Sequence, residues 1–113
     1  MRIRSIVLLG SLLAASCASV VPGEDEKGKT YFEPANQVLD AAEKFKADQG
    51  RYPMSLYELT PKYIASLPDE PGLQLDDYSG TMRFAYSREW PHPGRVVCTT
   101  VLGSHDWKCE DYK

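Results

Sequence analysis

The chain has 113 residues, which is enough for one domain with a modest hydrophobic core. Its 16 acidic residues outnumber its 13 basic residues, and the formal net charge is −3. This acidic balance, without a stripe of Lys and Arg, argues against nucleic-acid binding and against attachment to anionic lipid by charge alone.

The first 16 residues have the layout of a secretory signal peptide. Arg2 and Arg4 form a positive start, residues 6–15 are apolar apart from Gly10 and Ser11, and small residues follow. The apolar run is about ten residues long, whereas a helix that crosses a bilayer needs about 20. We therefore predict a signal peptide over residues 1–16, with a buried core helix as the alternative.

The small residues Ala14, Ala15 and Ser16 directly before Cys17 resemble the lipobox of bacterial lipoprotein signal peptides. The resemblance implies cleavage before Cys17 and a lipid on its sulfur, so that a membrane anchor holds the protein in the cell envelope, facing the periplasm. Ala18 stands where enteric bacteria place Asp to retain lipoproteins in the inner membrane, which points to the outer membrane. The typical lipobox has Leu in place of Ala14 and often Gly in place of Ser16. The alternative is an ordinary signal peptide cut nearby.

The rest of the chain divides into two predicted parts. Residues 17–32 are expected to form the lipidated cysteine and a flexible tether, because residues 18–30 are mostly polar and charged and have little to bury. Residues 33–113 are expected to form one globular domain of the α+β class. In this domain one long N-terminal helix packs on a small antiparallel sheet.

The predicted helix opens at Glu33-Pro34, since proline suits the first turn of a helix. It ends at Gly50, which is expected to adopt the left-handed conformation of a C-terminal cap. Apolar residues recur at helical spacing along one face: Ala35, Val38, Leu39, Ala42 and Phe45. We expect this stripe to pack in the core; a partner-binding face is the alternative.

A second, short helix is predicted where Ser55 and Glu58 have the spacing of a capping box. Leu56 and Leu59 are expected to face inward from it. Residues 66–72 are rich in proline, glycine and polar residues, which predicts a loop.

The C-terminal part is predicted to be strands. Residues 81–87 alternate with a period of two, which places Met82, Phe84 and Tyr86 on one face of a half-buried strand. Residues 90–94 contain two prolines and interrupt the sheet. Residues 95–102 and 106–112 are the next two strands.

The last two predicted strands are joined at Gly103-Ser104, which fits a two-residue hairpin turn with glycine first. If Leu102 and His105 pair across this turn, Cys98 lies directly opposite Cys109, at a distance that a disulfide can bridge. An exported chain meets an oxidising compartment, and lipidation accounts for the third cysteine. We therefore predict a hairpin closed by a Cys98–Cys109 disulfide.

The middle of the chain resembles the globular half of a type II secretion pseudopilin or type IV pilin. The resemblance covers roughly residues 35–87 and is carried by the helix, Gly50-Arg51-Tyr52-Pro53, Leu56-Tyr57-Glu58-Leu59, Pro61-Lys62-Tyr63-Ile64, Leu67-Pro68-Asp69-Glu70-Pro71 and Phe84-Ala85-Tyr86-Ser87. It implies a pilin-like head, and the terminal cysteine pair is similar to that of many pilins. The pilin peptidase site and the long apolar filament helix are missing, so a filament-forming role is not implied.

No catalytic motif was found in the sequence. Gly-x-Ser-x-Gly, P-loop and dinucleotide fingerprints do not occur. Ser104-His105-Asp106 contains the three residue types of a catalytic triad, but triads assemble from distant segments. We interpret these three residues as turn residues.

No cofactor and no metal site are predicted. Zinc held by His92, His105 and the cysteine pair is a minor alternative, because the spacing fits no compact zinc motif. Asp76-Asp77 stands where some pseudopilins bind calcium, but two carboxylates are weak evidence, and a solvated turn is the preferred interpretation.

The sequence thus predicts a lipid-anchored envelope protein with a non-catalytic interaction domain and a protein partner, accessory to a secretion or pilus assembly. The alternatives are a small periplasmic enzyme or inhibitor that uses residues 90–94 or the acidic loops, and a calcium-dependent ligand-binding module.

Overall fold

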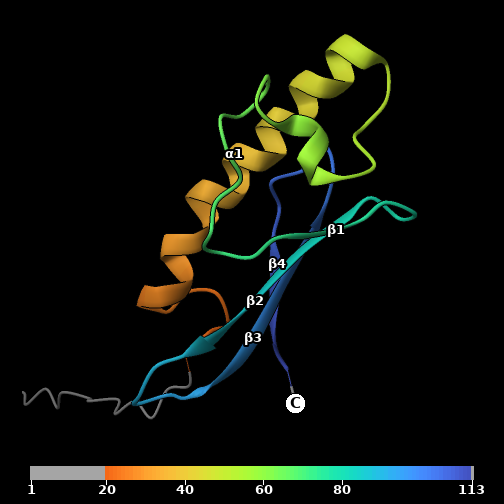
Figure 1. The fold of residues 1–113 in the computed structure, drawn as a ribbon. Helices are drawn as coiled ribbons and strands as arrows, with labels where there is room; N and C mark the ends of the chain where they lie inside the picture. Colours follow the sequence, from red (N-terminus) through yellow and green to blue (C-terminus); the bar gives the residue numbers. More distant parts are fainter. Residues whose placement is uncertain (1–19, 113) are drawn as a thin grey trace, which may run out of the picture.

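The structure is a computed structural model, and it describes residues 20–112. The predicted signal peptide and Cys17 lie outside these residues. The elements follow the order α1 (Glu26–Gln49), the 3₁₀ helix η1 (Leu56–Leu59), β1 (Gln74–Asp76), β2 (Thr81–Arg88), β3 (Gly94–Val101) and β4 (Lys108–Tyr112). The strands form one antiparallel sheet in the order β1-β2-β3-β4, and α1 lies along one face of it (Figure 1). The α+β class is confirmed.

Helix α1 begins at Glu26, well before the predicted start at Glu33. The Asp25 side chain caps it by accepting a hydrogen bond from the Gly28 amide at 3.1 Å. The prediction of a tether was therefore wrong for residues 26–32, and Pro34 lies inside the helix. The charged composition of this segment gave no sign of its packing. Tyr31 is buried against Phe84 and Tyr86. Tertiary packing of this kind stabilises helical turns that the local composition does not favour.

The predicted apolar stripe of α1 is confirmed as core. Its members are at most 5% exposed. Four members of the stripe pack with Leu56, Leu59 and Met82, whereas Ala35, nearest the N-terminal end, packs with Phe84, Tyr86 and Val96. The partly buried Leu73 and Trp107 pack against both clusters and join them into one layer between helix and sheet. Gly50 ends the helix with φ 78°, as predicted.

Strand β2 confirms the predicted alternation, because Met82, Phe84 and Tyr86 are all buried against α1. Arg83 and Ser87 point to the opposite, exposed face of the sheet. Strand β1 was not predicted, since three residues are too few to show a period of two.

The C-terminal hairpin confirms the predicted register and the disulfide. Cys98 is paired with Cys109 in the ladder of β3 and β4, their Cα atoms are 4.0 Å apart, and their sulfurs are bonded. Cys98 is fully buried under α1, so the disulfide fixes the edge strand β4 to the core layer.

The turn of this hairpin differs from the prediction. The Ser104 amide donates to the Val101 carbonyl at 3.1 Å, so Leu102 and Gly103 are the central residues, and Gly103 has φ 94°. A positive φ at the third position of a turn favours glycine. The Leu102 amide donates instead to the Gly80 carbonyl at 2.8 Å, so the predicted pair across Gly103-Ser104 does not form.

Removing the disulfide should destabilise the domain without changing its fold. The bond joins residues 11 apart, and closing so short a loop contributes roughly 3 kcal/mol at most to the free energy of unfolding. We expect the double variant Cys98→Ala/Cys109→Ala to lose up to this amount in urea unfolding. A reductant should lower the stability of the wild type and leave the variant unchanged; a wild type indifferent to reductant would contradict the disulfide.

Candidate functional site

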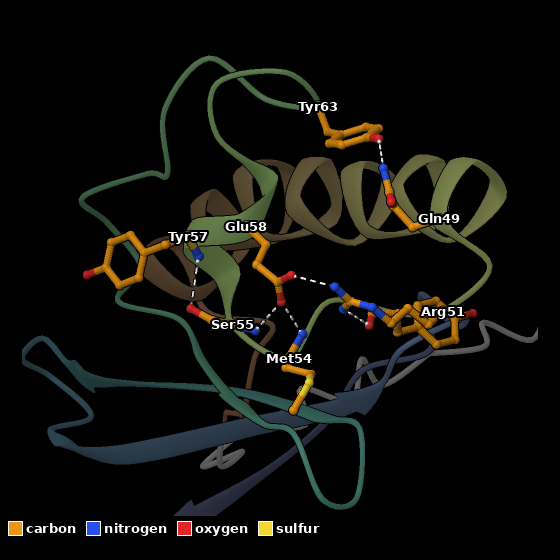
Figure 2. Close-up of polar contacts among 8 residues, drawn as sticks. Gln49, Arg51, Met54, Ser55, Tyr57, Glu58 and Tyr63 are labelled. Atoms are coloured by element: carbon orange, nitrogen blue, oxygen red, sulfur yellow. Dashed lines mark hydrogen bonds and ion pairs between the residues drawn. The ribbon is translucent and has the colours of Figure 1, made fainter.

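The strongest candidate for a functional surface follows the C-terminal end of α1. We call residues 50–60 the helix-exit loop. Its centre is the Glu58 carboxylate, which accepts hydrogen bonds from the backbone amides of Met54 at 2.6 Å and Ser55 at 3.2 Å (Figure 2). The Arg51 guanidinium donates to the same carboxylate at 2.9 Å. The predicted capping box is confirmed, since the Ser55 side chain accepts from the Glu58 backbone amide and the Glu58 carboxylate accepts from the Ser55 amide. The Ser55 hydroxyl also accepts from the Tyr57 amide.

These contacts favour the ionised form of Glu58. The hydrogen bond from Arg51 lowers the pKa of the Glu58 carboxyl, and the bonds from the Met54 and Ser55 amides lower it further. The carboxylate therefore stays charged at neutral pH. It binds the Arg51 guanidinium and the backbone amides of Met54 and Ser55, and so it fixes the loop at the start of η1. Charge-assisted hydrogen bonds of this kind are the stronger class.

The segment directly after the loop is attached to the end of α1. The Tyr63 hydroxyl donates to the Asp48 carboxylate at 2.9 Å and accepts from the Gln49 amide at 3.3 Å. Figure 2 shows Tyr63 lying over the last turn of the helix, with Gln49 pointing toward it. The chain is thus joined to α1 on both sides of η1, directly before the loop through the backbone and after η1 through Tyr63.

The fixed backbone holds two large apolar side chains in solvent. Met54 is 63% exposed and Tyr57 is 78% exposed, although Leu56 and Leu59 beside them are buried. The ring of Tyr57 points away from the Arg51–Glu58 pair (Figure 2). Exposed aromatic and methionine side chains on a rigid surface are typical of protein interfaces.

A hollow of about 520 Å³ adjoins Tyr57. Its lining is mainly apolar and aliphatic, and includes Leu56, Tyr57, Thr60, Leu67, Pro68 and Leu73. Asp69 adds one carboxylate to this lining. The hollow can accept an apolar side chain from another molecule.

A second polar cluster lies at the opposite end of α1. The Tyr86 hydroxyl donates a short hydrogen bond to the Asp25 carboxylate, and the Gly23 amide donates to the Tyr86 oxygen at 3.2 Å. Gly28 allows this approach, since a side chain there would collide with the Tyr86 hydroxyl. The cluster fastens the segment before α1 to the inner face of β2.

The electrostatics of this cluster follow from its geometry. Burial raises the pKa of the Tyr86 hydroxyl, and the Asp25 carboxylate raises it further. Burial also acts to raise the pKa of Asp25, but the hydrogen bonds from Tyr86 and Gly28, with the nearby Arg88, outweigh it and leave that pKa below its usual value. The pair therefore consists of a neutral tyrosine and a charged carboxylate, an arrangement that stabilises the fold.

The histidines and cysteines considered for zinc do not form a metal site. Both cysteines are in the disulfide, and His92 and His105 lie beyond opposite ends of β3. His105 lies 2.8 Å from the Asp40 carboxylate instead. Within residues 20–112, no group of three His, Cys, Asp or Glu side chains is placed to hold a metal ion.

The remaining sequence candidates are in turns. Asp76 is at the end of β1, where its carboxylate accepts from the Tyr78 amide at 3.1 Å. The Ser104 hydroxyl accepts from the Asp106 amide at 2.9 Å, a local turn contact. Cys17, the predicted lipidation site, is outside the described residues.

Two features were missed at the level of sequence. The Asp25–Tyr86 contact joins residues 61 apart, and no local motif marks such a pair. The exposure of Met54 and Tyr57 was also missed, although their neighbourhood was identified through the capping box.

Comparisons with protein-family models, with curated proteins and with solved structures found no match to this chain. Across residues 20–112, no helix is both long enough and apolar enough to span a membrane.

Replacing Asp25 with Asn should destabilise the protein near neutral pH, although Asn remains a good helix cap. The folded-state pKa of Asp25 lies below the ordinary value of 3.8. The charge therefore contributes stability above pH 3.8, and this contribution is lost as the pH falls through the folded-state pKa. Urea unfolding should show a gap between wild type and variant that narrows in acid.

The matched control for this prediction is Tyr86→Phe, which removes the donor and should itself cost about 1–3 kcal/mol. In the Tyr86→Phe background, Asp25→Asn should have a smaller effect than in the wild type. A gap between wild type and Asp25→Asn that stayed constant at every pH would contradict the charged interaction.

Proposed function

We propose that this protein is a lipid-anchored component of the bacterial cell envelope whose pilin-like head binds another protein and carries out no catalysis. The observation that supports binding most directly is the helix-exit loop, where Met54 and Tyr57 are exposed on a backbone fixed by Glu58. A preorganised loop loses little conformational entropy when a partner docks, and this favours affinity.

The position of the loop supports the same proposal. Helix α1 has 24 residues, and at 1.5 Å per residue it is about 36 Å long. The helix-exit loop follows its C-terminal end, whereas Cys17 precedes its N-terminal end in the sequence. A lipid on Cys17 would thus leave the loop at the free end of the molecule, accessible to a partner in the periplasm.

The pilin-like character rests on the sequence motifs and on the order of the elements. A helix, a Gly-x-Tyr-Pro loop, a short leucine-containing helix and an antiparallel sheet follow one another, as expected of a pilin head. Cys17 stands where a pilin would carry its filament helix. We therefore propose an accessory role in a secretion or pilus assembly, with the outer membrane as the site of the anchor.

Mass spectrometry of the mature protein tests the anchor. We expect the N-terminal residue to be Cys17 with a diacylglycerol on its sulfur, and we expect Cys17→Ser to release the protein from the membrane fraction. The variant keeps the globular domain unchanged, so its fold can be checked by circular dichroism. An unmodified Cys17, or an N-terminus elsewhere, would contradict the anchor.

Site-specific cross-linking in cells tests the binding surface. A photo-reactive amino acid at position 57 should give one discrete cross-linked product, since the native Tyr57 is 78% exposed beside the hollow. Position 78 is the matched control, because Tyr78 is 96% exposed but lies on the β1–β2 turn. Equal cross-linking from both positions, or none from position 57, would count against the proposal.

A further inference from the structure

The end of the molecule opposite the helix-exit loop has its own exposed apolar groups. We define the N-terminal pole as residues 20–27 together with residues 88–92, the turn after β2. Trp90 is 85% exposed and Val21 is 56% exposed. The two segments enclose a hollow of about 380 Å³, to which Val20, Trp90 and Pro91 contribute. Figure 1 shows this turn near the beginning of α1, away from the helix-exit loop.

The two segments of the pole are held together by several contacts. The Tyr86 hydroxyl, two residues before Arg88 in β2, binds Asp25 and the Gly23 amide. The Glu24 amide donates to the Val21 carbonyl at 3.0 Å, and Lys27 lies 3.8 Å from Glu89. From Val21 onward the chain is therefore part of the folded domain and not a separate linker.

The length of chain before the pole limits its distance from the proposed anchor. Only Ala18 and Ser19 separate Cys17 from Val20. An extended residue spans at most about 3.6 Å, so the Cα atoms of Cys17 and Val20 are at most about 11 Å apart. The headgroup layer on each side of a bilayer is several ångströms thick, since the hydrocarbon core of about 30 Å lies within a total of about 40–45 Å. A lipid on Cys17 thus brings the pole to the membrane surface.

We propose that the N-terminal pole rests in the headgroup layer of the bilayer that holds the anchor, with the Trp90 indole and Val21 in the interface. The inference rests on the proposed lipid at Cys17. Tryptophan suits this layer because its ring is apolar and its N–H remains in a polar environment. Val21 adds a second apolar contact on the segment that leads directly from the anchor.

The charge of the pole selects the kind of lipid surface. The carboxylates Glu24, Glu26 and Glu89 are exposed, and Lys27 is the cation that faces Glu89. Arg88 is paired with Asp111 at 3.0 Å, so its charge is already compensated. Anionic lipid would repel this surface. A zwitterionic headgroup presents its ammonium group outermost, where the carboxylates can meet it.

Contact between the N-terminal pole and the bilayer would also orient the molecule relative to the membrane. Helix α1 starts at the pole and carries the helix-exit loop at its other end. Two contacts with the membrane, the lipid and Trp90, restrict the rotation that a single lipid would allow. The exposed Met54 and Tyr57 would then face away from the bilayer.

Tryptophan fluorescence of the full-length lipidated protein in vesicles tests this proposal. The protein is reconstituted in phosphatidylcholine vesicles whose acyl chains carry bromine, a quencher of nearby tryptophans. The two tryptophans differ, since Trp107 packs against α1 and donates to the Asn36 side chain at 2.8 Å. We expect quenching in the wild type, and we expect Trp90→Phe to lose that quenching. Partial replacement of phosphatidylcholine by phosphatidylglycerol should reduce it.

The matched control is Trp90→Phe/Tyr78→Trp, which moves the exposed indole to the β1–β2 turn. This indole should remain accessible to aqueous iodide and should escape the brominated lipid. Protein that fails to float with the vesicles would overturn both the anchor and the seated pole. Protein that floats while Trp90 stays accessible to iodide and unquenched by lipid would overturn the seated pole alone. Stronger quenching in anionic vesicles would overturn the assignment to zwitterionic lipid.

Discussion

The packing of one stripe of α1 on the inner faces of β2 and β3 is the interaction on which the domain depends. Phe84 and Leu39 are both at most 1% exposed and lie in the layer between helix and sheet. Full burial of a side chain of this size stabilises the folded state by about 1.5–3 kcal/mol. A chain of this length has few such side chains. Helix α1, strand β2 and the capped helix η1 therefore all contribute buried side chains to the same core.

This single layer also determines where the two ends of the molecule lie. At one end, Tyr86 reaches past the core and binds Asp25, which fixes the start of α1 to the sheet. At the other end, Leu56 and Leu59 enter the core and hold the helix-exit loop. Of the apolar groups left in solvent, Trp90 lies beside the first turn of α1, and Tyr57 lies on the loop that follows the end of this helix. Such a separation suits a protein that we propose to be anchored at one end and to bind a partner at the other.

The disulfide joins the edge strand β4, which has few apolar contacts, to the buried part of the sheet. Strand β4 has five residues and lies at the edge of the sheet, where its outer backbone groups meet no further strand among the described residues. Its sequence is charged, which protects an edge from pairing with other chains but contributes little to the core. Cys109 binds this strand covalently to the buried Cys98 and so compensates for the lack of apolar contacts.

Much of this arrangement could be predicted from the sequence, because it depends on short-range chemistry. The apolar stripe, the Gly50 cap, the Ser55–Glu58 capping box and the register of Cys98 with Cys109 each follow from spacing over a few residues, and each is confirmed. The short helix within the candidate site was predicted through its capping box. What the site presents to solvent was not, since exposure depends on how the whole domain packs.

Local patterns in the sequence were enough to predict the end of α1 and the start of η1, whose hydrogen bonds close within a few residues, and the alternation of β2, which follows from its period of two. The start of α1 depends on the tertiary structure, because Tyr31 packs on Phe84 and Tyr86 of β2 and the capping residue Asp25 is bound by Tyr86, far along the chain. The tertiary structure likewise decided the turn at Gly103, since the Leu102 amide finds its acceptor at Gly80 rather than across the hairpin. In both cases the deciding partner is distant in sequence, where no local spacing can indicate it.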